Sequence, residues 1–347
     1  MANWNIPEQA AALHRDAILC DTSKSWIIQH PRGDVRAESL EECVENGVNY
    51  VALTLANDWQ GMDQTLHTMA NERAFVQANP DKYKFVETVD DILSAKQENK
   101  LAIGFGFQGT QSLDNDVNMV GVYYKLGIRT MLMAYNAKNS AGDGCMEITD
   151  AGLTHFGVQV VQEMNRVGMI ADGTHTGYRT TMNLMEVSTE PVIFSHSNAW
   201  GAWNHPRNIK DDQIKACAKT GGVICVMGVG TFVGDNDDTA EGLLKHIDYI
   251  SKLVGPEHVG IGLDFVFGWP HNNPGTSGVF NPKDAHKKAT EEASGGKSSV
   301  EWLDIKFVKP ARLPEVTEGM IKRGYSETEI RGVLGENWLR VARQVWK

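Results

Sequence analysis

The chain has 347 residues and a formal net charge of −11, with acidic and basic residues interspersed along its length. This length allows either two domains or one large α/β barrel, and both could bury an ample core. Because basic clusters are absent, the composition argues against a nucleic-acid-binding surface and a polybasic membrane anchor, and it favours a protein that acts on small molecules.

The N-terminal stretch and the cysteines both bear on the compartment. MANWNIPEQAAALHRDAILCD has neither a basic start nor a sustained apolar stretch, and no later segment is apolar over the length that crosses a bilayer. The five cysteines form no CxxC pair and are odd in number, which is typical of reduced thiols. We therefore expect a cytoplasmic protein.

Apolar runs rich in β-branched residues recur along the whole chain, and we expect them to form strands. Eight such runs lie at 17–21, 49–56, 101–109, 128–135, 168–175, 191–197, 221–228 and 258–265. Helical periodicity separates them, as in the segment where Phe156, Val160 and Met164 share one face. Eight buried strands alternating with helices predict a closed parallel α/β barrel, the (β/α)8 TIM barrel. The competing open doubly wound sheet lacks its GxGxxG motif after the first run.

After the eighth run we expect a lid and then C-terminal helices, which complete a single domain over 1–347. The segment 266–312 is rich in Gly, Pro, Asn and Lys and is far longer than an ordinary connection, so we expect a lid over the mouth of the barrel. Amphipathic helices are predicted over 313–347. Ser326 followed by Glu329 indicates a capping box at the start of one of them.

Polar residues collect at the carboxyl ends of the expected strands, where chemistry is located in barrels of this kind. They are Asp21, Thr22 and Ser23 after the first run, Gln108 after the third, Tyr135 and Asn136 after the fourth, His175 after the fifth, His196 after the sixth and Asp264 after the eighth. His175 and His196 end consecutive strands, so their imidazoles can converge as metal ligands, although each could instead be structural. Neutral imidazoles favour zinc in a site that leaves a position open for water.

Two aspartates near the histidines have alternative interpretations. Asp264 is either a further metal ligand or the base that takes a proton from water, and its structural alternative is a cap for the lid. Asp172 either fixes the tautomer of an imidazole or anchors a loop by hydrogen bonds.

Several longer motifs resemble the membrane dipeptidase (renal dipeptidase) family of metallopeptidases, a branch of the amidohydrolase-like barrels. They are "GLTHFGVQVVQEMNRVGMIADGTH", "PVIFSHS", "HPRN" followed by "DDQI", "GIGLDF" and "LPEVTEGMIKRGYSETEIRGVLGENWLRV". The resemblance covers nearly the entire chain. It implies a metal-dependent hydrolase barrel with two zinc ions that share a carboxylate, hydrolysis of dipeptides, and a homodimer.

Four residues match functional positions of that family. His175 and His196 correspond to the histidines of its second zinc, and Asp264 to the aspartate at the end of its eighth strand. Arg207 corresponds to the arginine that binds the terminal carboxylate of the substrate. A guanidinium suits that task because it pairs bidentately with a carboxylate, while the structural alternative is a surface ion pair with Asp211 or Asp212.

Other positions depart from the family pattern. Ser23 and Ser25 stand where the family has a histidine and an aspartate ligand, and we assign them no metal role. Gln108 replaces the bridging glutamate, and Tyr135 replaces a histidine that stabilises the transition state. Because a binuclear centre needs carboxylates to neutralise its charge, we expect at most one metal.

That metal would be held by His175 and His196, with a third contact from Gln108, Tyr135, Asp264 or a water. For Gln108, a purely hydrogen-bonding role is the alternative. The sequence thus predicts a metal-dependent hydrolase, most simply with one zinc, that cleaves a small carboxylate-bearing amide or dipeptide-like metabolite. Generic dipeptides are expected to be poor substrates.

In this hypothesis Asp264 and Tyr135 are catalytic, and Arg207, Trp200 and His271 bind the substrate. A second hypothesis keeps the metal but assigns an isomerase, epimerase, tautomerase or lyase in which Tyr135 or Asp264 moves a proton. A third is a binding protein without catalytic activity.

Overall fold

Seven parallel strands and one bridging segment form the barrel in the computed structural model, which describes residues 4–26, 34–267 and 304–347. One sheet has the order β1 (Cys20–Lys24), β2 (Tyr50–Asn57), β4 (Leu101–Gln108), β5 (Ile128–Leu132) and β6 (Ile170–Asp172), and a second pairs β7 (Ile224–Val226) with β8 (Val259–Ile261). These strands are buried along their whole length, as a sheet covered on both faces requires.

The two sheets are parts of one ring. The run predicted at 191–197 joins them by single parallel bridges, from Asp172 to Ile193 and from Phe194 to Ile224. On the other side, the backbone N–H of Asp264 donates to Ser23 O at 2.9 Å, which connects the end of β8 to β1. The predicted (β/α)8 barrel is therefore confirmed.

One short strand, β3, is not among the eight strands predicted from the sequence. β3 (Tyr83–Phe85) pairs with the first half of β4, where β5 has not yet begun, and β5 takes over along the second half. With only three residues, β3 is too short for a periodic pattern to be distinguished from a turn.

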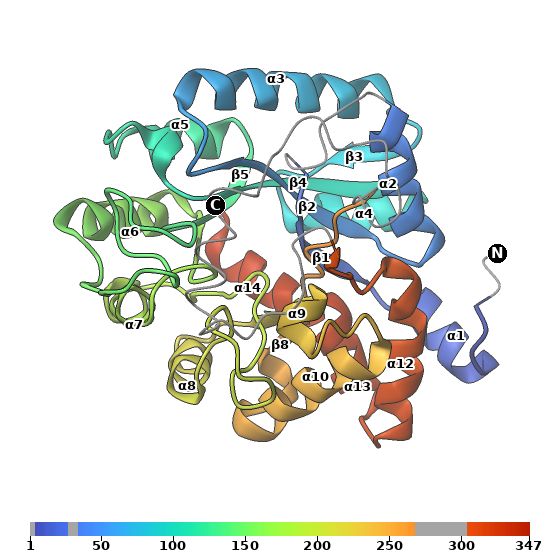
Figure 1. Ribbon diagram of the computed structural model, residues 1–347. Helices are drawn as coiled ribbons and strands as arrows, with labels where there is room; N and C mark the ends of the chain where they lie inside the picture. The colour runs from blue at the N-terminus through green and yellow to red at the C-terminus, as the bar shows by residue number, and fades with distance from the viewer. Residues whose placement is uncertain (1–3, 27–33, 268–303) are drawn as a thin grey trace.

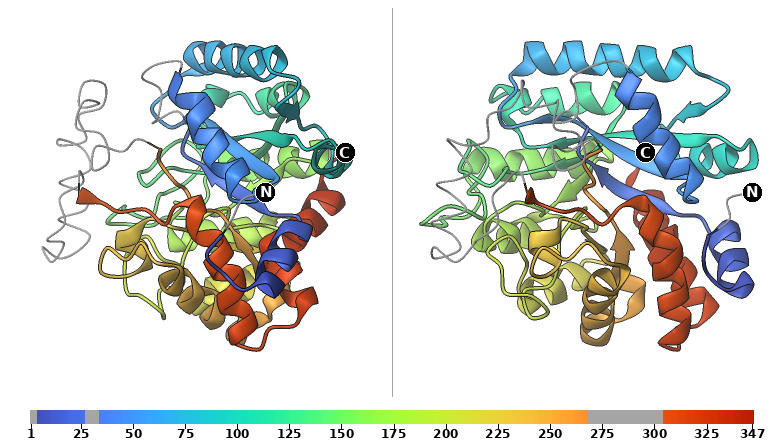
Figure 2. Two further views of the ribbon diagram at one scale, coloured as in Figure 1. Left: turned by 90° about the vertical axis from the view of Figure 1, so that its right-hand side faces the viewer. Right: turned by 45° about the vertical axis from the view of Figure 1, so that its right-hand side comes forward.

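Helices surround the ring of strands in all three views (Figure 1, Figure 2). They are α1 (Glu8–Asp16), α2 (Asp34–Glu45), α3 (Met62–Ala78), α4 (Val89–Gln97), α5 (Met119–Lys125), α6 (His155–Val167), α7 (Tyr178–Val187), α8 (Asp211–Lys219), α9 (Gly230–Val233), α10 (Ala240–Val254), α12 (Leu313–Lys322), α13 (Glu327–Arg331) and α14 (Asn337–Val345). None of the helices in the described part of the chain is both long and apolar enough to span a membrane.

Helix α6 illustrates how the sequence specifies these elements. The hydroxyl of Thr154 accepts a hydrogen bond from Gly157 N at 3.0 Å, and Gly168 ends the helix with a φ of 94°. Val160 and Met164 are fully buried against the sheet, as the periodicity predicts.

The C-terminal helices close the end of the barrel opposite the site. Ser326 and Glu329 form the predicted capping box at the start of α13. On α14, Trp338 is buried and stacks on Tyr50 of β2 with ring centroids 4.6 Å apart. Most of the predicted lid, 268–303, lies outside the described residues; the chain after it returns beside β7, where Phe307 bridges to Val229.

Candidate active site

The two histidines meet at the carboxyl ends of neighbouring strand segments. Nε2 of His175 and Nε2 of His196 lie 2.9 Å apart, and both rings are buried. Two imidazoles bound to one tetrahedral zinc at 2.0–2.1 Å would have these atoms roughly 3.3 Å apart, so a small outward movement of the rings admits an ion. His175 adopts a left-handed φ of 63°.

Each imidazole is oriented through its other nitrogen. His175 Nδ1 contacts Asn136 Oδ1 at 2.7 Å, and Cys145 Sγ donates to the same oxygen at 3.4 Å. His196 Nδ1 contacts Ser195 Oγ at 2.7 Å. With an amide oxygen as partner, Nδ1 of His175 carries the proton and its Nε2 offers a lone pair, which is the arrangement of a metal ligand.

Of the two alternatives for Asp172, the structure shows the one in which it anchors loops by hydrogen bonds. Its Oδ1 accepts hydrogen bonds from the backbone N–H of Thr174 at 2.9 Å and of Ser195 at 3.1 Å, and it fixes the two segments that carry the histidines. Asn136, which the sequence marks only as a polar strand-end residue, is the side chain that holds the His175 ring.

Gln108 lies between the histidines and Ser23 of β1. Its amide nitrogen lies 3.4 Å from His196 Nε2 and 3.3 Å from Ser23 Oγ. The nitrogen and oxygen of an amide are interchangeable in such an assignment, so a rotated Gln108 places its oxygen at the same point. A neutral oxygen ligand for a metal on the histidines is therefore within reach.

Two serines at the end of β1 hold the carboxylate of Asp264. The register of β1 on β2 shifts between Asp21 and Lys24, and the hydroxyls of Ser23, within this irregularity, and Ser25, just after the strand, both donate to Asp264 Oδ1. The Ser23 contact is 3.5 Å long, and the Ser25 contact is much shorter. The two positions that lack metal-ligating side chains thus bind a carboxylate instead.

Asp264 is half-buried and has a φ of 54°. Burial raises its pKa to about 6, against the opposing effects of the Ser25 hydrogen bond and the positive charge of Arg207. Such a carboxyl group is ionised at neutral pH but accepts a proton readily, which suits a general base.

Arg207 is buried next to the histidine pair. It is 3% exposed, and its guanidinium donates to Ser197 Oγ at 3.3 Å and to His196 O at 3.1 Å. Its Nε has no hydrogen-bond partner among the described residues. Asp211 and Asp212 instead accept hydrogen bonds from the hydroxyls of Tyr249 and Tyr178. A buried cation with an unused donor is a site for an anion.

Together with burial, the charge of Arg207 also holds the pKa of His196 well below its usual value. The ring is therefore neutral at pH 7, as a metal ligand must be.

Tyr135 stacks on His175 with ring centroids 4.0 Å apart. Burial and the nearby carboxylate of Asp264 raise the pKa of Tyr135 well above its usual value, so its hydroxyl stays protonated and can donate. Its backbone N–H donates to Asp58 Oδ2 at 2.7 Å, and Trp59 packs edge-on against its ring at 5.0 Å. Sequence reasoning missed Asp58 and Trp59, although both directly follow the second strand.

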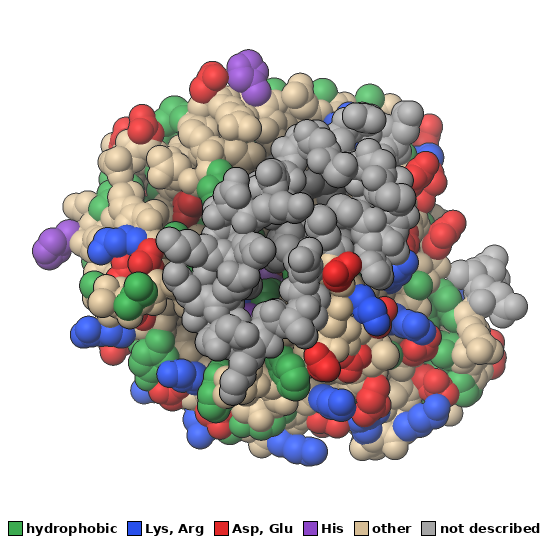
Figure 3. Space-filling model, viewed as in Figure 1, with side chains coloured by type: hydrophobic (Ala, Val, Ile, Leu, Met, Phe, Trp, Pro, Cys, Tyr) green, Lys and Arg blue, Asp and Glu red, His purple; other side chains and the backbone are tan. Residues whose placement is uncertain are grey.

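Of the two remaining predicted site residues, the structure describes Trp200 alone. Trp200 lies on the loop that carries Arg207, is 40% exposed, and makes no ring contact with His175 or His196 within the described part of the chain. His271 lies outside the described residues. On the face seen in Figure 3, small patches of histidine show near the centre and other histidines lie at the edge, where acidic and basic side chains are mixed.

The site offers two converging imidazole nitrogens to a metal ion. Among the residues that the structure describes, no group of three or more His, Cys, Asp and Glu side chains could hold a metal. His175 and His196 are the nitrogen donors, and among the described residues the amide of Gln108 lies beside them, 3.4 Å from His196 Nε2. Asp264 is the one carboxylate of this set, and two serines already bind it.

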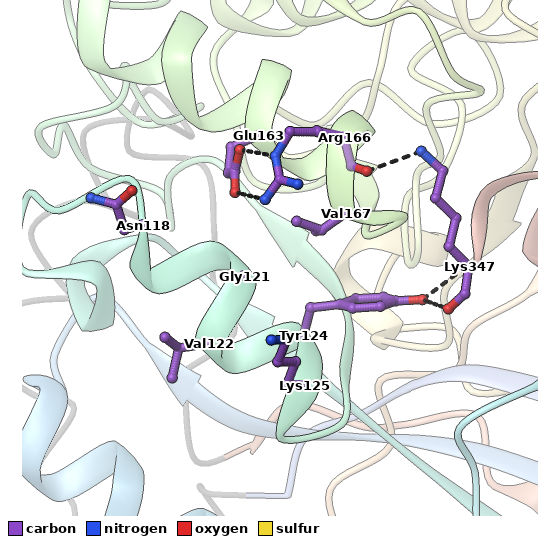
Figure 4. A pocket seen from close by; sticks show the side chains of 9 residues that line it. All are labelled: Asn118, Gly121, Val122, Tyr124, Lys125, Glu163, Arg166, Val167 and Lys347. Carbon is purple, nitrogen blue, oxygen red and sulfur yellow. Dashed lines mark hydrogen bonds and ion pairs between the residues drawn. The ribbon is translucent and has the colours of Figure 1, made fainter.

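A separate surface groove of about 590 Å³ lies between α5 and α6 (Figure 4). The charged groups on its α6 side, Glu163 and Arg166, pair with each other at 2.6 Å, and Lys347 donates to the carbonyl oxygen of Arg166. The groove has no part in the arrangement around the histidines.

Comparison with known proteins identifies the family of the chain. Residues 18–279 match the family model "Membrane dipeptidase (Peptidase family M19)". An uncharacterized dipeptidase of Schizosaccharomyces pombe is 31% identical over 291 residues, which are 81% of this chain and 70% of that protein.

Solved structures show the same barrel. An amidohydrolase from Pseudomonas aeruginosa superposes with a TM-score of 0.83 at 30% identity, over 97% of this chain and 99% of that one. A Rhodobacter sphaeroides metallopeptidase bound to a phosphinate mimic of L-Ala-D-Ala shares the fold, with a TM-score of 0.76 at 18% identity over 95% and 100% of the two chains. The chain belongs to the membrane dipeptidase family, peptidase family M19, and is a metal-dependent hydrolase of the dipeptidase type.

Proposed function

We propose that the protein hydrolyses a small amide or dipeptide-like metabolite that carries a carboxylate, with one zinc ion held by His175, His196 and the side-chain oxygen of Gln108. The observation that carries this proposal is the convergence of the two imidazole Nε2 atoms at 2.9 Å, next to a buried arginine with an unused donor.

The residues around the histidines divide the work of hydrolysis. A bound zinc supplies Lewis acidity to the scissile carbonyl and lowers the pKa of water. Asp264 takes the proton from the attacking water and returns it to the leaving amine, because its pKa of about 6 allows both steps near neutral pH. Arg207 binds the substrate carboxylate through its guanidinium, and the Tyr135 hydroxyl donates to the oxygen that becomes negatively charged.

One ion, not two, follows from the charges of the donors. A second divalent cation would need carboxylate or imidazole ligands on β1, where Ser23 and Ser25 supply only hydroxyls. Both hydroxyls already donate to Asp264, so its negative charge is shared with them before it could compensate a second ion. The cytoplasmic location, the homodimer and the single-domain organisation stay predictions.

A panel of dipeptides and N-acyl amino acids, each paired with its C-terminal amide, tests this function. Reactions are followed by quantifying both expected products. We expect release of an amine and a carboxylic acid in equal amounts, only from members with a carboxylate. Conversion to a single product of unchanged mass would indicate an isomerase instead, and equal turnover of the amides would remove the carboxylate from the proposal.

A further inference from the structure

The carboxylate of Asp58 lies where the backbone leaves three neighbouring strands. Asp58 directly follows β2, β4 ends at Gln108, and β5 ends at Leu132. Beyond these ends the backbone N–H groups have no strand partner, so each needs another acceptor. Asp58 takes no part in the catalytic scheme proposed above, but it meets this need for the ends of β4 and β5.

Asp58 accepts four hydrogen bonds. Its Oδ1 accepts from the backbone N–H of Thr110 at 2.9 Å and of Gln111 at 3.1 Å. Its Oδ2 accepts from the backbone N–H of Tyr135 at 2.7 Å and from Asn139 Nδ2 at 2.9 Å. An ionised carboxylate has acceptor sites for about four hydrogen bonds, whereas an amide of the same shape has one oxygen and an NH₂ group that only donates. This set of donors therefore requires a carboxylate.

The backbone just after Gln108 comes unusually close to this carboxylate. Gly109 has a φ of 145°, in the region that favours glycine, and a Cβ at this position would lie 2.2 Å from Asp58 Oδ1. A side chain on residue 109 would therefore displace either the carboxylate or the end of β4. The close approach at Gly109 and the hydrogen bonds to the two following residues hold this segment against Asp58.

The two anchored segments carry the side chains that contact the histidine pair from this side. Tyr135 stacks on His175 with ring centroids 4.0 Å apart, and its own backbone N–H is bound by Asp58. Gln108 Nε2 lies 3.4 Å from His196 Nε2, two residues before the first bound N–H of β4. Asp58 thus acts on both side chains through the backbone that carries them.

We propose that Asp58 is a positioning residue for the proposed hydrolysis, because it fixes Tyr135 and Gln108 relative to the histidine pair. The proposal rests on the function proposed above. In that function the Tyr135 hydroxyl donates to the oxygen that becomes negatively charged, and a displacement of about 1 Å costs roughly a hundredfold in rate. Since Arg207 binds the substrate carboxylate, loss of Asp58 should lower kcat and leave KM nearly unchanged.

The kinetic test uses the best substrate from the panel of dipeptides and N-acyl amino acids. Both kcat and KM of the zinc-loaded enzyme are measured for Asp58→Ala, Asp58→Asn and Asp116→Ala, each with and without Tyr135→Phe. Asp116 is a matched control because it is another turn aspartate, whose Oδ1 accepts from the backbone N–H and the side chain of Asn118 at 2.9 and 2.8 Å. Denaturant titration measures the stability of each variant separately.

For Asp58→Ala and Asp58→Asn we expect kcat to fall roughly tenfold to a hundredfold. In the Tyr135→Phe background the same substitutions should cost much less, because the hydroxyl that they displace is already absent. Asp116→Ala should leave kcat unaltered in both backgrounds. An equal loss of kcat in both backgrounds, a loss confined to KM, or no loss would each overturn the assignment.

A spectroscopic measurement separates this inference from the proposed hydrolysis. In the metal-free protein, the ring current of Tyr135 should shift the NMR signal of the His175 Cε1 proton, and Tyr135→Leu gives the position of that signal without the ring. Asp58→Ala should move the signal toward the Tyr135→Leu position, and Asp116→Ala should not. Such a movement in a protein that cleaves no member of the panel would support the positioning and contradict the hydrolysis. Turnover with an unmoved signal would do the reverse, and absence of both would overturn both.

Discussion

The two sides of the barrel mouth carry different side chains at equivalent strand-end positions. On the side of β6 and the 191–197 segment, two strand-end side chains are neutral imidazoles whose Nε2 atoms face each other. On the side of β1 and β8, the strand-end side chains are hydroxyls that donate to Asp264. In the proposed function, the two neutral imidazoles bind the metal ion and the hydrogen-bonded carboxylate transfers the proton. A few strand-end residues thus distinguish the two sides.

The largest expected effect comes from removing the metal-binding half. His175→Ala combined with His196→Ala should abolish metal retention and lower kcat/KM by roughly a thousandfold or more, because both converging nitrogen donors are removed. Elemental analysis and circular dichroism of the purified variant check metal loss and folding separately. Full metal retention by a folded double variant would disprove the ligand assignment.

Arg207→Lys removes the planar donor that lies beside this half. A lysine keeps the charge but cannot pair bidentately, so we expect a loss of about 2–5 kcal/mol in transition-state stabilisation for a carboxylate-bearing substrate. The change should be much smaller in the free energy of unfolding, measured by denaturant titration. Unchanged kcat/KM would exclude Arg207 from the site.

Asn136→Ala tests the hydrogen bond that orients His175. Loss of the 2.7 Å contact frees the imidazole to rotate and to change tautomer, so metal affinity should fall by roughly tenfold to a hundredfold. Competition with a chelator measures the affinity. Asn165→Ala, a substitution on α6 away from the site, serves as the control and should leave metal affinity unaltered.

Ser25→Ala should produce the smallest change in activity. It alters the side of β1 and β8, where Asp264 lies. The intact enzyme is expected to lose kcat/KM as the pH falls through about 6, because Asp264 becomes protonated and can no longer act as a base. The Ser25 hydrogen bond favours the ionised carboxylate, so its removal should raise the pKa and move this acid limb upward by about one unit. Ser23→Ala, which removes a longer contact, should shift it less; an unmoved limb in both would assign it to another group.

The sequence predicts the barrel and the convergence of the histidines because both follow from local patterns. Continuous apolar runs mark buried parallel strands, and a polar residue that ends such a run must lie at the mouth. The partners of those residues are not local. Asn136 reaches His175 across 39 positions, and Ser25 reaches Asp264 across 239, so only the closed ring shows which side chains meet.

Trp59 and Asp58 were missed for a related reason. A tryptophan and an aspartate after a strand are ordinary turn residues in sequence, and their roles depend on packing against Tyr135 and Thr110 from other strands. The sequence leaves open whether Asp172 binds an imidazole or backbone N–H groups. That choice depends on side-chain torsion angles, which a sequence pattern does not specify.

Measuring bound metal tests the difference between the two halves most directly. The purified protein is compared with a variant that carries Ser23→His, Ser25→Asp and Gln108→Glu. If the β1 half has lost its metal site, elemental analysis should return at most one equivalent of zinc per unmodified chain and more for the triple variant, since the variant restores an imidazole and two carboxylates. Two equivalents in the unmodified protein would contradict the account.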